Sequence, residues 1–225
     1  MNIKNNINYF RQNIPQGCKL ITVSKTQPVE RLLEAYNRGQ RIFGENKVQE
    51  LVPKYEALPK DIEWHMIGHL QSNKVKYIAP FITLIHAVDS LSLLKEINKQ
   101  AQRNQRVIAC LLQVHIAEEE SKFGFSEEDI LQLFVDPGFL QLNHISIMGL
   151  MGMATFTENE AQVRKEFTGL GLFFRKLQAM NLPAQVKMKE LSMGMSGDYN
   201  IAIEAGSTLV RIGTAIFGER DYSKK

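Results

Sequence analysis

The stretch LITVSK, residues 20–25, is a short run of apolar and β-branched residues that ends in a lysine. A short, continuously apolar run of this kind predicts a strand buried on both faces, as in a parallel sheet. The chain continues through Pro28 into VERLLEAYNRG, residues 29–39, where the proline suits a first helical turn and the glycine a helix end. Residues 20–39 therefore predict one strand–helix unit.

The same unit recurs along the whole chain. Further strands are expected at residues 41–46, 62–70, 83–89, 106–116, 145–154, 189–195 and 209–218, with helical patterns between them. Eight such units predict an α/β fold of the (β/α)8 TIM-barrel type, since closing the sheet leaves no exposed edge. A doubly wound open sheet is the alternative, but no G-x-G-x-x-G follows the first strand, where a dinucleotide-binding fold would place it.

The domain organisation is expected to be simple. Residues 1–225 show no linker, internal repeat or low-complexity tract, so they predict a single domain. Residues 1–15 form an N-terminal helix by this interpretation, with Ile3, Ile7 and Phe10 on one stripe. The tail at 219–225 is too short for an eighth helix, and we expect the N-terminal helix to cover that position.

Composition argues against several classes of function. The 27 basic and 24 acidic side chains are scattered, giving a formal charge of +3, which does not favour nucleic-acid or membrane partners. Cys18 and Cys110 cannot form a disulfide framework and have no metal-ligand spacing. No stretch approaches the roughly 20 apolar residues of a membrane span, so a cytoplasmic protein is expected. A closed barrel needs no partner subunit, which favours a monomer.

The chemistry is expected at the carboxyl ends of the strands, where barrel proteins place their sites. Lys25 ends the first strand, SMGMSGD at 192–198 lies at the carboxyl end of the seventh, and RIGT at 211–214 lies at the end of the eighth. Small residues and amides at a helix start favour a phosphate. Each residue also has an ordinary interpretation, with Lys25 as a solvated strand end, Ser196 as a helix cap and Arg211 as an outward salt-bridge former.

A lysine facing a phosphate-binding loop suggests an aldehyde-bearing phosphate held as a Schiff base, a description that pyridoxal 5′-phosphate (PLP) fits. The lysine must be uncharged to react, and Ile21 and Val23, on the same strand face, would supply apolar surroundings that lower its pKa.

Motifs along nearly the whole chain resemble one family. They are VSKT at 23–26, FGENKVQE at 43–50, WHMIGHLQSNK at 64–74, HAVDS at 86–90, SKFGF at 121–125, GLM at 149–151, LSMGMSGD at 191–198 and GSTLVRIGTAIFG at 206–218. In this order they resemble the YggS/PROSC family of pyridoxal phosphate homeostasis proteins.

The resemblance implies a barrel like the N-terminal domain of alanine racemase, with PLP as cofactor and Lys25 as its Schiff-base lysine. It implies that Arg211 lies near the ring, that Asn46 lines the mouth with His65 and His69, and that the phosphate is held by two loops. The residues implied in those loops are Ser192, Gly194, Met195, Ser196, Gly213 and Thr214.

The function expected is PLP homeostasis, by buffering the cofactor or delivering it to apo PLP-dependent enzymes, without catalysis. A permanent charge at Arg211 would disfavour protonation of the pyridine nitrogen, and a racemase also needs a second acid/base, for which only Tyr199 lies near the loops. Three alternatives stay open: a PLP-dependent racemase or related amino-acid enzyme, a Schiff-base aldolase, and a metal-dependent barrel enzyme. The last would use His65, His69, His86 or His115, although H-E-x-x-H is absent and no metal is expected.

Overall fold

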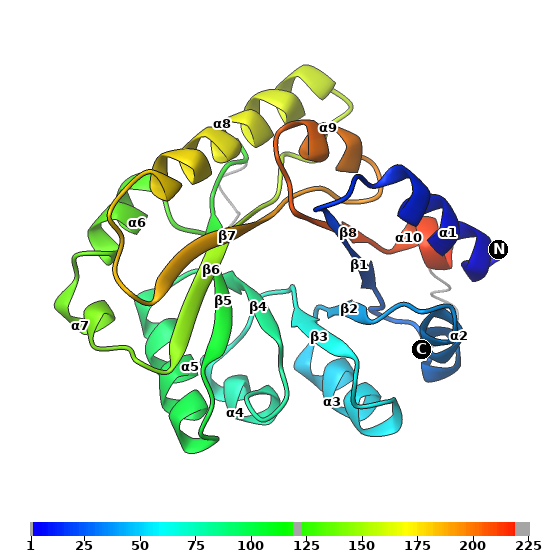
Figure 1. Ribbon diagram of the computed structural model, residues 1–225, viewed down its shortest axis with the longest axis horizontal. Coiled ribbons are helices and arrows are strands. Elements are labelled where there is room, and N and C mark those ends of the chain that lie inside the picture. Colours follow the sequence, from blue (N-terminus) through cyan, green and yellow to red (C-terminus); the bar gives the residue numbers. More distant parts are fainter. Residues whose placement is uncertain (1, 119–122, 219–225) are drawn as a thin grey trace.

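The computed structural model describes residues 2–118 and 123–218, which form a closed barrel of parallel strands ringed by helices (Figure 1). Its strands are β1 (Lys19–Val23), β2 (Ile42–Glu45), β3 (Glu63–Met66), β4 (Leu84–Val88), β5 (Ile108–Val114), β6 (Ile145–Gly152), β7 (Val186–Ser192) and β8 (Leu209–Ile212). They follow one another around the barrel in sequence order, and β8 pairs with β1. The TIM-barrel prediction is confirmed, and the open-sheet alternative is wrong.

The helices lie between successive strands on the outside of the barrel. The first of them along the chain are α2 (Val29–Asn37), α3 (Val48–Ala57), η1 (Ser72–Lys74), α4 (Val75–Ile78), α5 (Leu91–Arg103) and α6 (Glu127–Leu133). Those nearer the carboxyl end are α7 (Pro137–Leu140), α8 (Glu160–Gln178), α9 (Tyr199–Glu204) and α10 (Thr214–Phe217). Several begin at a capping side chain, and Ser90 accepts a hydrogen bond from the amide of Leu93 at the start of α5. None of the helices in the described ranges is long and apolar enough to span a bilayer.

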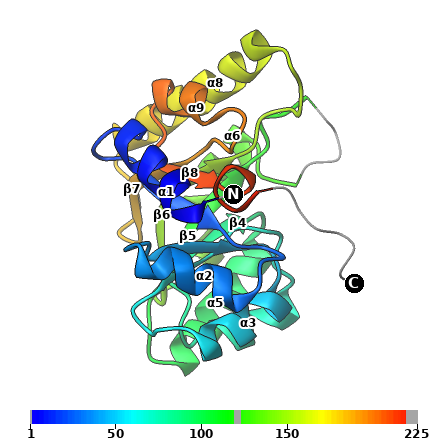
Figure 2. The same cartoon turned by 90° about the vertical axis from the view of Figure 1, so that its right-hand side faces the viewer.

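The N-terminal helix α1 (Ile3–Asn13) completes the outer ring beside α10 and α2 (Figures 1 and 2). Its stripe of Ile3, Ile7 and Phe10 is buried, and the Phe10 ring meets the Tyr199 ring edge-on at 5.4 Å. The side-chain amide of Asn6 donates to the carbonyl of Ile216, 2.9 Å away. The predicted covering role of this helix is confirmed, whereas the predicted tail at 219–225 lies outside the described residues.

Several element boundaries differ from the predictions, and the strand expected at 62–70 ends at Met66. The strand expected at 209–218 ends at Ile212, because its pairing with β1 ends at Thr22, and the chain turns at Gly213 into α10. The strand expected at 189–195 starts earlier, at Val186, and ends at Ser192. The capped helix expected within residues 121–134 is α6, which begins at Glu127, and Ser126 and Asp129 form its capping box.

Two layers of apolar side chains make up the core. The larger layer packs between the strands and the helices and includes Trp64, Phe43 and Phe167. A smaller cluster is formed by Ile21, Leu84, Ala87, Leu111, Met151 and Leu209. Residues two apart on a strand share a face, so Val23 and then Lys25 continue the side of β1 that carries Ile21. The lysine therefore follows a fully buried stretch of strand. That residues 1–225 form a single cofactor-binding domain stays a prediction.

Candidate functional site

A cavity of about 550 Å³ lies beyond the carboxyl ends of β1, β2, β6, β7 and β8. Its volume falls within the usual range of roughly 300–1,000 Å³ for small-molecule sites. Of the nine residues predicted to bind a cofactor, it brings seven together: Lys25, Asn46, Met195, Ser196, Arg211, Gly213 and Thr214. The other two, Ser192 and Gly194, do not line it; as direct cofactor contacts they stay predictions.

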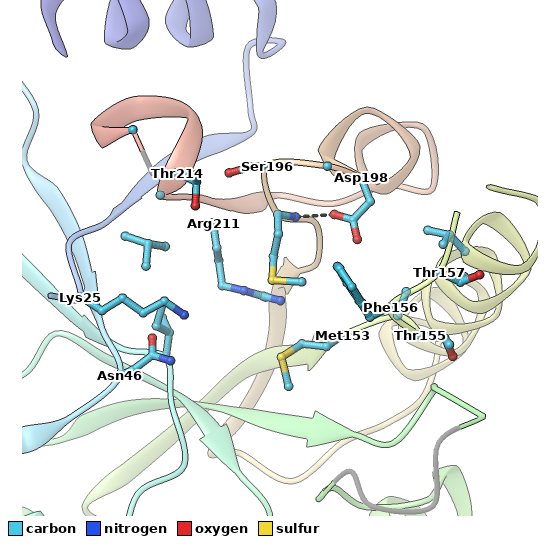
Figure 3. Close-up of a pocket in the computed structure, with 18 of the residues that line it drawn as sticks. Lys25, Asn46, Met153, Thr155, Phe156, Thr157, Ser196, Asp198, Arg211 and Thr214 are labelled. Carbon is cyan, nitrogen blue, oxygen red and sulfur yellow. Dashed lines mark hydrogen bonds between the residues drawn. The ribbon is translucent and has the colours of Figure 1, made fainter. Parts of the chain in front are cut away.

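Lys25 lies two residues beyond the end of β1, and its side chain reaches into the cavity beside Asn46 (Figure 3). Val23 lines the same wall, so aliphatic surface adjoins the lysine as expected. The Oδ1 atom of Asn46 is buried and finds no hydrogen-bond partner among the described residues. Buried polar atoms are almost always paired, so an acceptor left open at a cavity wall favours a ligand that donates to it.

The loop after β7 is shaped by one glycine and one carboxylate. Gly194 has a φ of +89°, and a Cβ there would lie 2.6 Å from the Cβ of Ala202. The Met195 amide donates to Oδ1 of Asp198, 2.5 Å away (Figure 3). The Met195 carbonyl in turn accepts from the amide of Tyr199 at 2.9 Å. These contacts turn the chain back into α9 and direct Ser196 toward the cavity.

The two loops of the predicted phosphate site leave backbone donors open. The amides of Ser196, Gly197, Gly213 and Thr214 make no hydrogen bond within the described part of the chain. The hydroxyls of Ser196 and Thr214 face the same cavity. Successive unpaired amides form a concavity suited to an anion. The helix that follows the first of these loops, α9, has six residues.

Arg211 supplies the positive charge of the site from inside the barrel. It is 5% exposed, so its interpretation as an outward salt-bridge former is wrong. Its Nη1 donates to the carbonyl of Ser192 at 3.0 Å and to the Ser192 hydroxyl at 2.6 Å, and its Nη2 donates to the carbonyl of Gly152 at 3.1 Å. Desolvation lowers the pKa of Arg211 to about 10, opposed by the charge of Asp198, so the guanidinium stays charged at neutral pH.

A chain of buried polar side chains continues from Arg211 through the barrel. Nδ1 of His86 lies 3.0 Å from the Ser192 hydroxyl, and Nε2 of His86 lies 3.0 Å from Nδ1 of His65. Burial lowers the pKa of His65 to about 3, and burial together with the neighbouring His65 and Arg211 lowers the pKa of His86 well below its ordinary value. The Ser192 hydroxyl accepts from Arg211, and the chain of contacts is satisfied when this hydroxyl donates to Nδ1 of His86 and Nε2 of His86 donates to Nδ1 of His65.

The histidines of the WHMIGH motif do not act together. His65 is buried in the barrel and does not line the mouth, so that expectation is wrong for this residue. His69 is half exposed, with Nδ1 3.2 Å from Oδ2 of Asp89 and its ring stacked on Phe123 at 5.0 Å. Within the described ranges, no group of three or more potential ligands is placed to hold a metal ion.

One wall of the cavity was not predicted from the sequence. It is formed by Thr155, Phe156 and Thr157, in the loop between β6 and α8. The amide and hydroxyl of Thr155 each donate to the Glu166 carboxylate of α8, both at 2.7 Å. The only sequence signal was position, since TFTENE directly follows a buried strand and thus lies at its carboxyl end.

Comparison with known proteins places the chain among close relatives. Residues 1–221 match the family described as alanine racemase, N-terminal domain. The pyridoxal phosphate homeostasis protein of Aquifex aeolicus is 44% identical over 209 residues, which is 91% of this chain and 88% of that protein. The PipY protein of Synechococcus elongatus has been solved without PLP and with PLP bound, at 35% and 34% identity and TM-scores of 0.89 and 0.86, covering 96% of this chain and 100% of PipY.

An alanine racemase of Clostridium difficile shares the fold alone. It is 14% identical with a TM-score of 0.78, and the likeness covers 97% of this chain but 60% of the racemase. The chain is therefore more similar to the homeostasis proteins than to the racemase. Its sequence identity to the Aquifex protein and to PipY is more than twice its identity to the racemase, and both similarities cover most of the chain. The chain belongs to the family of pyridoxal phosphate homeostasis proteins, which carry the alanine racemase N-terminal barrel.

Proposed function

We propose that this chain binds PLP, with Lys25 as its covalent anchor, and that it acts in PLP homeostasis. The observation that carries the proposal is the placement of Lys25 on the same cavity as the open amides of the loops after β7 and β8. The amides suit a phosphate, and the lysine suits an aldehyde on the same small molecule. The PLP-bound structure of PipY, a relative at 34% identity, supports the choice of cofactor.

The residues present fit the cofactor. Bound PLP supplies an aldehyde, with which the uncharged amine of Lys25 condenses to a Schiff base with loss of one water. The loop amides and the hydroxyls of Ser196 and Thr214 would hold the phosphate, and Arg211 would present its charge to the ring. The open Oδ1 of Asn46 would accept a hydrogen bond from the bound molecule.

The protein is proposed to hold and release PLP rather than to transform amino acids. Of the described residues that line the cavity, the titratable ones are Lys25, Asp198 and Arg211. Tyr199, the tyrosine considered as a second acid/base, is 8% exposed and packs against Phe10 instead of lining the cavity. A charged Arg211 near the ring would disfavour protonation of the pyridine nitrogen and thus weaken the cofactor as an electron sink.

Exposed side chains at the rim of the cavity suit a protein that takes up and releases PLP. Phe156, on the cavity rim, is 97% exposed, and Met195, in the loop after the neighbouring strand β7, is 38% exposed. A cofactor held near such a rim stays accessible, which suits buffering of free PLP or its delivery to apo PLP-dependent enzymes. A monomeric protein is sufficient for this role, since the cavity is built from one barrel.

Absorbance and chemical trapping test the proposal together. Wild-type protein incubated with PLP is expected to develop a visible-range band that borohydride bleaches, with the reduced adduct mapped to Lys25. K25A is expected to lose the band and the adduct, whereas K47A, which removes an exposed lysine outside the cavity, keeps both. A K25A protein with unchanged absorbance and PLP affinity would refute the site.

Turnover assays separate PLP homeostasis from the amino-acid enzyme alternative. The homeostasis proposal predicts that PLP-loaded protein does not exchange the α-hydrogen of L- or D-alanine for deuterium in heavy water. Sustained exchange that K25A abolishes would instead establish the amino-acid enzyme alternative.

A further inference from the structure

The backbone on both sides of Lys25 is tied to one face of α3. The carbonyl of Ser24 accepts a hydrogen bond from Nζ of Lys54 at 2.8 Å, and the amide of Thr26 donates to Oε2 of Glu50 at 2.6 Å. Glu50 and Lys54 are four residues apart on this helix, with 3.6 Å between their charged atoms. One turn of α3 therefore holds the residue before Lys25 and the residue after it.

The anchor before Lys25 is completed by a buried ion pair. Oε1 of Glu45, at the end of β2, lies 2.7 Å from Nζ of Lys54 and accepts from the Ser24 hydroxyl at 2.6 Å. The side chains of Lys54 and Glu45 are 8% and 0% exposed. Removing such charges from water offsets most of their attraction, so a buried pair adds little net stability. The pair instead fixes the positions of the Ser24 hydroxyl and carbonyl, to which it is hydrogen-bonded.

The anchor after Lys25 holds an unfavourable backbone conformation. Thr26 has a φ of +64°, which is the left-handed region and a rare conformation for a β-branched residue. Such strain persists only where surrounding contacts impose it, and it concentrates at functional sites. The carboxylate of Glu50 accepts from the Thr26 amide and so holds the chain in this turn directly after the lysine.

Neither anchor residue belongs to the cavity. Glu50 and Lys54 do not line it, and their carboxylate and ammonium groups bond the backbone of Ser24 and Thr26 instead. A contact with the backbone next to a reactive lysine controls where its amine can reach. Reaction requires the amine and the carbonyl carbon to meet at near-attack distance, and small misplacements reduce reactivity strongly.

We propose that Glu50 and Lys54 are positioning residues that set the reach of the Lys25 amine toward an aldehyde held in the cavity, an inference that rests on the proposed function. They act on covalent capture and leave the phosphate site unchanged, because that site is built by loops on β7 and β8. Loss of Glu50 or Lys54 should therefore weaken covalent capture at Lys25 and leave binding at the phosphate site intact. Damage to the fold would weaken both.

The experiment compares covalent capture with non-covalent binding. Capture is measured as the equilibrium constant for the borohydride-reducible adduct of Lys25 with PLP. Non-covalent binding is measured with pyridoxine 5′-phosphate, which carries the phosphate and ring but an alcohol in place of the aldehyde. E50L is expected to bind pyridoxine 5′-phosphate like wild type while capture of PLP weakens about tenfold, the usual effect of one lost hydrogen bond to a charged group. E50Q keeps an acceptor oxygen and should restore capture.

Two further variants keep the test decisive. E56L removes an exposed carboxylate from the same helix and should match wild type in both measurements. The double variant E45Q/K54M removes the buried pair without leaving one charge unpaired, and it should show the same selective loss as E50L. Urea unfolding verifies that each variant is folded.

The possible failures are distinguishable. Wild-type protein without any adduct at Lys25 would refute the proposed function itself. An adduct in wild type with undiminished capture in E50L and E45Q/K54M would refute the positioning role alone. Equal losses of capture and of pyridoxine 5′-phosphate binding, without rescue by E50Q, would assign these residues a purely structural role and would also overturn the inference.

Discussion

Acid is expected to destabilise the fold through the histidines buried inside the barrel. Burial lowers the pKa of His65 to about 3, and the pKa of His86 also lies well below its ordinary value. Both rings are therefore uncharged in the folded protein at neutral pH. In the unfolded chain each regains a pKa of about 6.5 and takes up a proton as the pH falls below that value.

The size of the effect follows from the difference in protons bound. Between about pH 6.5 and pH 5 the unfolded chain binds a proton at His65 that the folded protein does not, at ~1.4 kcal/mol per pH unit. The free energy of unfolding should thus fall by about 2 kcal/mol at pH 5 through His65 alone. Because the pKa of His65 is lower in the folded protein than in the unfolded chain, its contribution to the free energy of unfolding is complete above about pH 6.5. That contribution is lost as the pH falls toward 3.

Glu45 titrates in the opposite sense. Burial, the largest cause, raises its pKa despite the charge of Lys54, so its contribution is present at low pH and is lost as pH rises through the folded pKa. The total pH dependence of wild type therefore mixes both signs. A difference between wild type and a histidine variant isolates the histidine contribution.

The assay is urea unfolding at about pH 7.5 and pH 5 for wild type, H65Q and H144Q. Glutamine at position 65 can still hydrogen-bond His86 but does not titrate. Wild type is expected to lose about 2 kcal/mol more than H65Q between the two pH values. H144Q is the control for replacing a partly exposed histidine outside this chain of contacts. Equal losses in wild type and H65Q would refute the reasoning that burial keeps His65 uncharged.

Three other substitutions test the site. T214V should weaken retention of PLP by about 1–2 kcal/mol, or roughly 5- to 30-fold, in equilibrium dialysis, by removing one hydrogen bond to a charged group; unchanged retention would remove Thr214 from the phosphate site. S192A should lower the free energy of unfolding in urea by about 1–3 kcal/mol, because Arg211 loses a buried acceptor, and a neutral result would contradict that pairing. G194A should cost about 1–3 kcal/mol in the same assay, since its φ of +89° is strained for alanine and the added Cβ meets Ala202; S196A is its control, and equal stability of the two would contradict the strain argument.

The sequence predicted the barrel because its signals are local. Each strand is a short apolar run, and each is followed by a helix with its own start or stop residue, such as Ser90 before α5. Lys25 was placed at a strand end by the same pattern, and small residues marked the loop around Gly194. These features depend on neighbours within a few residues, so a single sequence is sufficient to predict them.

The buried contacts depended on strand register and were not predicted. His65, His86 and Ser192 belong to β3, β4 and β7, and only the closed barrel brings their side chains into one chain with Arg211. Likewise, the overlong eighth strand was an error of pairing, since the last pair between β8 and β1 is Ile212 with Thr22. The proposed positioning role of Lys54 also depends on a contact between distant segments, since α3 bonds the backbone beside Lys25 through Glu50 and Lys54.

The pairing of β8 with β1 is the seam that closes the barrel, and the candidate site straddles it. Ile21 lies opposite Arg211 in this register, so the proposed anchor Lys25 and the loops proposed to hold the phosphate come from the two ends of the chain. Partly folded chains, in which the first and last strands have not met, would carry Lys25 and the amides of the phosphate loops as separate pieces. Only a chain with a closed barrel would then bind the cofactor. A cofactor that binds only the closed barrel would stabilise the pairing of β8 with β1 by mass action.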